Sequence, residues 1–183
     1  LLDRPKKLIL MTHYGLPKNQ DENYSTKIII KTLQTYLRIN SICFLENGFC
    51  TTNEEIQAND SVVCLMENVR FHNFETKPNN VDTIQFHIDI FCNEAFSASH
   101  RDHYSITRMN TPIHCYGYCF IKEIETFNMI LKNNGGIMTA IIGGSKVSDK
   151  MPMLEKLSTI VDYIFVAGNN LNSIQENSDF FNK

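Results

Sequence analysis

Short runs of apolar residues alternate along the chain with longer segments of mixed polarity. Each apolar run ends in a polar loop, which is typical of a buried strand. Strands are expected at Lys7–Thr12, Ser41–Leu45, Ser61–Met66, Ile88–Cys92, Ile137–Ile142 and Tyr163–Val166. Helices are expected between them, at Ser25–Leu37, Phe120–Leu131 and Lys146–Ser158. In the first helix, Ser25 is a suitable N-cap, and Ile29 and Leu33 lie on one face.

This alternation of strands and helices predicts an α/β fold with a doubly wound parallel sheet. Ligands of such sheets bind beyond the carboxyl ends of the strands. Residues suited to chemistry follow the predicted strands in this way: His13, Glu67–Arg70, Asn93–Arg101 and Lys146 after the Gly143–Gly144 turn. We therefore expect the functional site at this edge of the sheet.

Composition and charge exclude several classes of protein. The 183 residues are 43% hydrophobic and 20% charged, which suits a globular chain with a buried core. A net charge of −3 does not favour a nucleic-acid binder or a membrane-surface protein. No apolar run approaches the roughly 20 residues of a membrane span.

The six cysteines are dispersed and form no CxxC pairs, so we predict neither disulfides nor a zinc site. This pattern favours an intracellular, reducing compartment, with the cytosol as the first expectation and an organelle matrix as the alternative. The chain starts at Leu1 rather than Met. An N-terminal segment, with any targeting peptide, is therefore expected to be missing.

Four segments resemble, in order, the signature motifs of the phosphoglycerate kinase family. The first, Thr12–Lys18, reads Thr-His-Tyr-Gly-Leu-Pro-Lys and is similar to the family's Ser-His-x-Gly-Arg-Pro loop. Met66–His72 is close to Leu-Glu-Asn-x-Arg-Phe-His, and Cys92–Arg101 resembles Val-Asn-Asp-Ala-Phe-Gly-x-x-His-Arg. Gly143–Lys150, Gly-Gly-Ser-Lys-Val-Ser-Asp-Lys, is nearly identical to Gly-Gly-Ala-Lys-Val-Ser-Asp-Lys.

The resemblance implies a particular domain organisation. Residues 1–115 would be the family's Rossmann-like N-terminal substrate domain without its first strand. Residues 116–134 would be the inter-domain helix. Residues 135–183 would be the first βαβ part of the C-terminal nucleotide domain, which would be incomplete.

The resemblance also implies the glycolytic phosphoryl transfer between 1,3-bisphosphoglycerate and ADP, with magnesium, which forms 3-phosphoglycerate and ATP. Such chemistry depends on positioning and on positive charge around the phosphates. The matching positions would bind the acid through His13, Arg70 and Arg101, and the nucleotide through Ser145, Lys146 and Lys150. Lys146 would lie nearest the transferred phosphoryl group, and Asp149 would belong to the magnesium–nucleotide site.

Purely structural roles remain open for the same residues. Glu67, Asn68 and Phe71 are expected to lock a loop onto the sheet. His13 is equally compatible with a hydrogen-bonded loop histidine. Arg70 and Arg101 are compatible with salt-bridge partners in an inactive site.

Ala167–Asn170 replaces a glycine-rich turn of the family, and three positions of the predicted substrate domain also depart from the family pattern. Leu16 replaces an Arg, which removes a charge-assisted hydrogen bond. Glu94 replaces an Asp and lengthens a side chain in a tight loop. Ser97 replaces a Gly, so strain is expected there if the backbone requires positive φ.

Two functional hypotheses follow. In the first, the chain is a truncated phosphoglycerate-kinase-like protein that is catalytically incompetent by itself, with Mg-ATP or Mg-ADP bound only if the site survives. In the second, it is a non-catalytic pseudoenzyme that serves as a structural or assembly subunit of a larger protein complex. The second hypothesis predicts an exposed apolar surface near Met151, Leu154 and Phe165.

Overall fold

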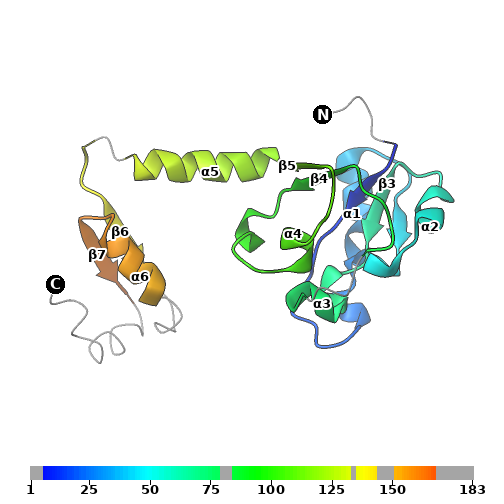
Figure 1. Ribbon diagram of the computed structural model, residues 1–183, viewed down its shortest axis with the longest axis horizontal. Helices are drawn as coiled ribbons and strands as arrows, with labels where there is room; N and C mark the ends of the chain where they lie inside the picture. Colours follow the sequence, from blue (N-terminus) through cyan, green and yellow to red (C-terminus); the bar gives the residue numbers. More distant parts are fainter. Residues whose placement is uncertain (1–5, 79–83, 133–134, 144–150, 168–183) are drawn as a thin grey trace. The chain divides into compact units, whose positions relative to one another are not determined.

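The computed structural model describes residues 6–78, 84–132, 135–143 and 151–167 (Figure 1). The chain forms two compact units, Leu1–Ile121 and Lys122–Lys183. Each unit has its own strands and its own group of buried apolar side chains, and each is described separately.

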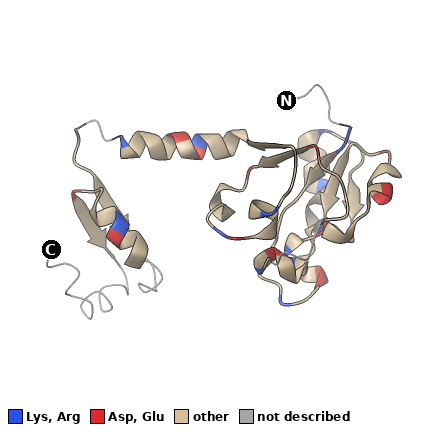
Figure 2. Ribbon diagram, in the orientation of Figure 1, with Lys and Arg blue, Asp and Glu red and all other residues tan. Residues whose placement is uncertain are grey.

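The strands of the first unit form two parallel sheets. The first sheet has the order β1-β3-β2, built from β1 (Leu8–Leu10), β2 (Cys43–Leu45) and β3 (Val63–Met66). The second sheet pairs β4 (Ile90–Asn93) with β5 (Ile113–Tyr116). None of these strands contains a charged residue, and they are tan in Figure 2. The predicted parallel α/β class is confirmed, although the described strands lie in separate sheets.

The helices of the first unit are short. Ser25 accepts a hydrogen bond from the backbone N of Lys27 at 3.2 Å and starts a 3₁₀ turn at Thr26–Ile29. This turn continues into α1 (Ile30–Leu37), which ends at Arg38 with φ of 55°. The remaining α-helices are single turns between strands, α2 (Asn53–Gln57), α3 (Asn73–Thr76) and α4 (Tyr104–Thr107). Further 3₁₀ turns are Glu22–Tyr24, Gly48–Cys50, Val69–Phe71 and Phe96–Ala98.

An aromatic cluster occupies the core of the first unit. The ring of Phe49 lies 5.4 Å from that of Phe74 and 5.5 Å from that of Tyr104, centroid to centroid. Met66 of β3 and Phe91 of β4 belong to the same buried core. Side chains from both sheets therefore pack into one apolar interior.

The second unit contains β6 (Thr139–Ile142), α6 (Met151–Ser158) and β7 (Tyr163–Val166). Strands β6 and β7 pair in parallel. Leu154 is only 1% exposed because it packs with Ile142 in this unit's own small core, so the prediction of an exposed Leu154 is wrong. Met151 is partly buried in the same core, whereas Phe165 is 61% exposed, as predicted.

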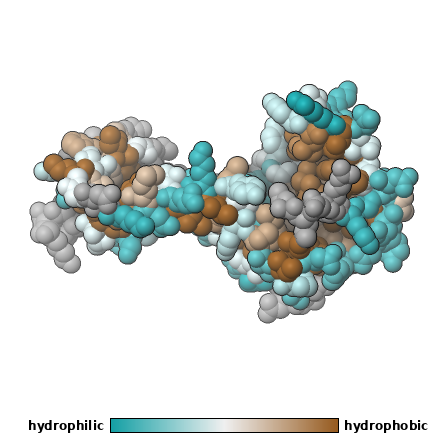
Figure 3. All heavy atoms as spheres, turned by 90° about the horizontal axis from the view of Figure 1, so that it is seen from above, coloured by the Kyte–Doolittle hydropathy of each residue, from teal (hydrophilic) through white to brown (hydrophobic). Residues whose placement is uncertain are grey.

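Helix α5 (Tyr118–Leu131) runs from the first unit into the second. Many of its apolar side chains are exposed, and Figure 3 shows hydrophobic surface along it beside hydrophilic surface. Exposed members are Tyr118, Ile121, Ile124, Phe127, Met129, Ile130 and Leu131. The division into residues 1–115, 116–134 and 135–183 stays a prediction.

His72 gives the stability of the first unit a specific dependence on pH. Its Nε2 accepts a hydrogen bond from the backbone N of Phe49 at 3.2 Å, and burial lowers the pKa of its imidazole below the ordinary 6.5. The unfolded chain therefore takes up this proton at higher pH than the folded chain. Stability is fully present above the unfolded pKa and is lost as the pH falls through the folded pKa. The lowered pKa values of His13 and His103 act in the same direction.

We expect the free energy of unfolding to fall between about pH 7.5 and about pH 5.5 in urea titrations. His72→Gln keeps a hydrogen-bond acceptor but does not titrate. The free energy of unfolding of this variant should therefore fall less steeply with decreasing pH than that of the unmodified chain. His87→Gln, at an exposed position, is the control. If the free energy of unfolding falls equally with pH in His72→Gln and in the unmodified chain, His72 is not the cause of the pH dependence.

Candidate functional site

Four basic side chains gather where the loops after β1, β3 and β4 meet. Burial lowers the pKa of the His13 imidazole, and the charges of Arg70 and Arg101 lower it further, followed by His103. The pKa of His103 is lowered by burial and then by the same two arginines. These mutual effects place the four groups within electrostatic range of one another. We call His13, Arg70, Arg101 and His103 the basic cluster.

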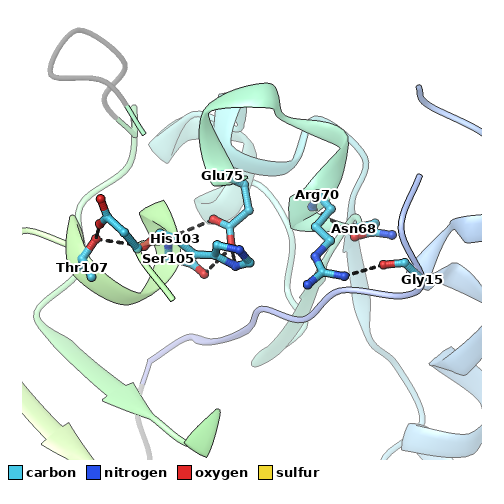
Figure 4. Close-up of polar contacts among 8 residues, drawn as sticks. Gly15, Asn68, Arg70, Glu75, His103, Ser105 and Thr107 are labelled. Atoms are coloured by element: carbon cyan, nitrogen blue, oxygen red, sulfur yellow. Dashed lines mark hydrogen bonds and ion pairs between the residues drawn. The ribbon is translucent and has the colours of Figure 1, made fainter. Parts of the chain in front are cut away.

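Arg70 is held in place by the loop that carries His13. Its Nη1 donates a hydrogen bond to the carbonyl oxygen of Gly15 at 2.6 Å, and Figure 4 shows the side chain directed at that loop. Its Nε is buried and has no hydrogen-bond partner among the described residues. Burial lowers the pKa of the guanidinium, and the charge of Arg101 lowers it further. An anion bound between the two guanidinium groups would offset the repulsion between them.

Gly15 is required by the shape of this loop. Its φ is 65°, in the left-handed region that residues with a Cβ rarely adopt. A Cβ here would also come within 2.5 Å of the Tyr24 ring. The glycine lets the backbone turn close to Tyr24, and its own carbonyl oxygen accepts the hydrogen bond from Arg70.

Asn68 fastens the loop to the end of β3. It is fully buried, and its Nδ2 donates to the carbonyl oxygens of Tyr14 and Tyr24, both at 2.8 Å. Its Oδ1 accepts from the backbone N of Arg70 at 3.1 Å. One side chain therefore sets the positions of both the His13 loop and the Arg70 turn.

Glu67 makes a second attachment beside Asn68. Its carboxylate accepts hydrogen bonds from Ser25 Oγ at 2.7 Å and from the backbone N of Thr26 at 2.9 Å. Thr26 Oγ1 in turn donates to the carbonyl oxygen of Met66 at 2.8 Å. The expected structural role of Glu67 and Asn68, locking a loop onto the sheet, agrees with these contacts.

A buried carboxylate lies behind the basic cluster. Glu75 is 2% exposed and accepts hydrogen bonds from the backbone N and Oγ of Ser105 at 2.9 and 2.8 Å. Its Oε1 lies 3.4 Å from His103 Nδ1 (Figure 4). Burial raises the pKa of Glu75, while the Ser105 hydrogen bonds and the Arg70 charge lower it. Glu75 thus orients His103 and supplies a counter-charge to Arg70.

Sequence reasoning missed Glu75 and His103. The available signal for His103 was its position two residues after Arg101, within the same loop. Glu75 gave no such signal, because its burial depends on the packing of α3 against α4.

The substituted positions have clear structural surroundings. The Glu94 carboxylate accepts hydrogen bonds from the backbone N of Cys119 at 2.9 Å and of Phe120 at 3.1 Å. These bonds at the start of α5 lower the pKa of Glu94. Ser97 lies in the 3₁₀ turn and has no positive φ, so the strain expected there is wrong. Leu16 is 77% exposed.

The residues expected to bind nucleotide and metal, Ser145, Lys146, Asp149 and Lys150, lie outside the described residues. Within residues 6–78, 84–132, 135–143 and 151–167, no group of His, Cys, Asp and Glu could hold a metal ion. In those same ranges, no helix is both long and apolar enough to cross a membrane.

A surface hollow of about 700 Å³ lies elsewhere in the first unit, between the 3₁₀ turn at Thr26–Ile29, β2 and the end of β3. Its lining includes Asp21, Glu22, Glu46 and Glu67 against a single cation, Lys27. This excess of carboxylates repels phosphate and carboxylate ligands. The basic cluster, rather than this hollow, is therefore the candidate site for an anion.

Comparison with known proteins gives a consistent result. The family model described as phosphoglycerate kinase matches residues 1–179. A phosphoglycerate kinase of Wolbachia pipientis wMel is 34% identical over 176 residues, covering 92% of this chain and 43% of the relative. One from Plasmodium falciparum is 31% identical over 182 residues, covering 88% of this chain and 44% of the relative.

Solved structures show the same fold. A phosphoglycerate kinase from Pyrococcus horikoshii matches with a TM-score of 0.74 at 23% identity, covering 94% of this chain and 46% of that one. The enzyme from Coxiella burnetii matches with a TM-score of 0.69 at 24% identity, covering 94% and 44%. The chain spans less than half the length of each of these relatives.

Replacing Asn68 tests the attachment of the loop. Asn68→Asp replaces the Nδ2 group, which donates to the carbonyl oxygens of Tyr14 and Tyr24, by a carboxylate oxygen that cannot donate and repels them. We expect the free energy of unfolding to fall by about 2 kcal/mol or more in urea denaturation. Asn73→Asp makes the same change at an exposed position and should stay within about 0.5 kcal/mol of the unmodified chain. Equal effects of the two changes would refute the role of Asn68.

Proposed function

The chain belongs to the phosphoglycerate kinase family, and we propose that its first unit binds the phosphorylated acid of that family's reaction. The observation that supports this is the convergence of His13, Arg70 and Arg101 from three separate loops. The two arginines repel one another and neutral His13 offers a hydrogen bond beside them, so the arrangement favours a bound phosphate or carboxylate. The ligand proposed is 3-phosphoglycerate or 1,3-bisphosphoglycerate.

Each residue of the site has a distinct task in this proposal. Arg70, fixed by Gly15, presents its fork in one orientation, which suits two-point binding of an oxyanion. Arg101 is exposed and supplies the second positive charge. His13 is held neutral by its surroundings at neutral pH and donates one hydrogen bond, and a bound anion would raise its pKa.

We further propose that this chain does not complete phosphoryl transfer alone. The reaction requires groups around both reactants, and the chain spans only 43–46% of the relatives. By resemblance, Ser145, Lys146 and Lys150 would hold the nucleotide phosphates, and Asp149 the magnesium. A bound Mg-nucleotide would accept the phosphoryl group from 1,3-bisphosphoglycerate, or supply it in the reverse direction, and the basic cluster would only bind and orient the acid.

A second candidate function is that of a non-catalytic subunit of a larger assembly. The observation favouring it is the exposed apolar surface of α5, which includes Phe127 and Met129. Light scattering of the purified chain separates the two candidates. A stable, monodisperse monomer at high concentration would count against the assembly role.

Binding of 3-phosphoglycerate tests the first proposal. We expect Arg101→Ala to weaken binding about tenfold to a hundredfold in calorimetry, because one charge-assisted contact is lost. Arg108→Ala removes the same charge from the same region, but Arg108 is not a member of the basic cluster and pairs with Asp102 at 3.3 Å. The affinity of the Arg108→Ala variant for 3-phosphoglycerate should be nearly unchanged.

Two results would contradict the proposal in separable ways. If millimolar 3-phosphoglycerate leaves the melting temperature of the unmodified chain unchanged, the acid site is absent. If the chain alone turns over substrate in a coupled assay, the proposed acid site is retained. The proposal that the chain does not complete phosphoryl transfer alone is then rejected. Equal losses for Arg101→Ala and Arg108→Ala would show only a general charge effect and would also reject the site.

A further inference from the structure

Two pairs of cysteines face each other across neighbouring parallel strands of the first unit. Cys43 of β2 is the register partner of Cys64 of β3, and Cys92 of β4 is the register partner of Cys115 of β5. Neighbouring strands lie about 4.7–4.9 Å apart, and register partners point to the same face of a sheet. This separation falls within the Cα distances of about 4.4–6.8 Å that a disulfide accepts.

Burial distinguishes the two pairs. Cys64 is completely buried and Cys43 is half-buried, so a dissolved reagent has poor access to them. Cys92 and Cys115 are both exposed free thiols. The Cys115 thiol also raises the pKa of Cys92, as expected for two thiols on neighbouring strands.

We propose that Cys92 and Cys115 form an accessible dithiol that closes to a cross-strand disulfide by exchange with a low-molecular-weight disulfide such as oxidised glutathione. In the first step, the thiolate of one cysteine attacks the reagent, and one glutathione thiolate leaves and takes up a proton. In the second, the other cysteine, as its thiolate, attacks the mixed disulfide and releases the second glutathione. Two protein thiols are oxidised and one glutathione disulfide is reduced to two thiols.

The site is poised for slow exchange rather than for nucleophilic catalysis. Burial, the Cys115 thiol and the Glu94 carboxylate raise the pKa of the Cys92 thiol. The attacking thiolate is therefore a minor species at neutral pH. The register of β4 and β5 favours the second, intramolecular step, because it holds the resolving cysteine directly opposite the mixed disulfide.

Closure would act directly on the segment that carries half of the basic cluster. Arg101 and His103 both lie between Cys92 and Cys115 in the chain. A covalent link at the ends of this segment restricts its unfolded conformations, which stabilises the loop that holds these two residues. The oxidised chain should accordingly melt at a higher temperature than the reduced chain.

The test uses the reduced chain of 183 residues under native conditions. It is incubated with oxidised glutathione, quenched in acid, alkylated and mapped by mass spectrometry. We expect a Cys92–Cys115 link with the loss of two hydrogen atoms and no retained glutathione. Cys92→Ser and Cys115→Ser should each lose this link and instead retain one glutathione on the remaining cysteine of the pair.

Cys50→Ser is the matched control, since Cys50 is an exposed thiol without a register partner. This variant should form the Cys92–Cys115 link at the same rate as the unmodified chain. The proposal is overturned if Cys92 and Cys115 both retain glutathione without a link. It is equally overturned if Cys43–Cys64 oxidises as fast, or if either exposed thiol links to Cys119 instead.

Discussion

The candidate site depends on the attachment of one loop to the end of one strand. Glu67 and Asn68, the two residues after β3, bind the segment between Tyr14 and Thr26 through hydrogen bonds of 2.7 to 2.9 Å. A loop of this length would otherwise have many conformations, and His13 would not stay beside Arg70. Because Asn68 also binds the backbone of Arg70, the His13 loop and the Arg70 turn share one fixed point. Without the hydrogen bonds of Asn68, the side chains of His13 and Arg70 would no longer be held beside each other, although both would still be present.

Much of the fold could be predicted from the sequence. Tyr163–Val166 has the predicted bounds, and β1, β3 and α5 lie within or close to the predicted segments. These elements are continuous apolar or amphipathic runs, for which local pattern and final burial agree. Strand β5 was missed because its sequence, Ile-His-Cys-Tyr, has no apolar run, and each of its residues is exposed. Its strand form depends on pairing with β4, which the local sequence does not encode.

The site was predictable only in part, for a related reason. His13 and Arg70 follow β1 and β3, neighbouring parallel strands whose carboxyl ends meet at one edge, whereas Arg101 follows β4 of the second sheet. Glu75 is different, because a carboxylate becomes a buried partner of Ser105 and His103 only after two short helices have packed. Leu154 shows the opposite error: it was assigned to a surface, but α6 packs against its own strands. Glu94 shows that a lengthened side chain has a structural role at the start of α5.

The small size of the sheets has a consequence for the handling of this protein. Among the described residues, β4 and β5 each pair with a single neighbour, and the four residues of β5 are all exposed, so its outer side has N–H and C=O groups that no described strand pairs with. A two-stranded sheet is marginal in water, and this one depends on the packing of Phe91 into the core. An open edge beside exposed Ile113 and Tyr116 is a template for strands of other molecules. Concentrated samples are therefore prone to edge-to-edge aggregation, which a lysine on the outer edge of β5 would discourage.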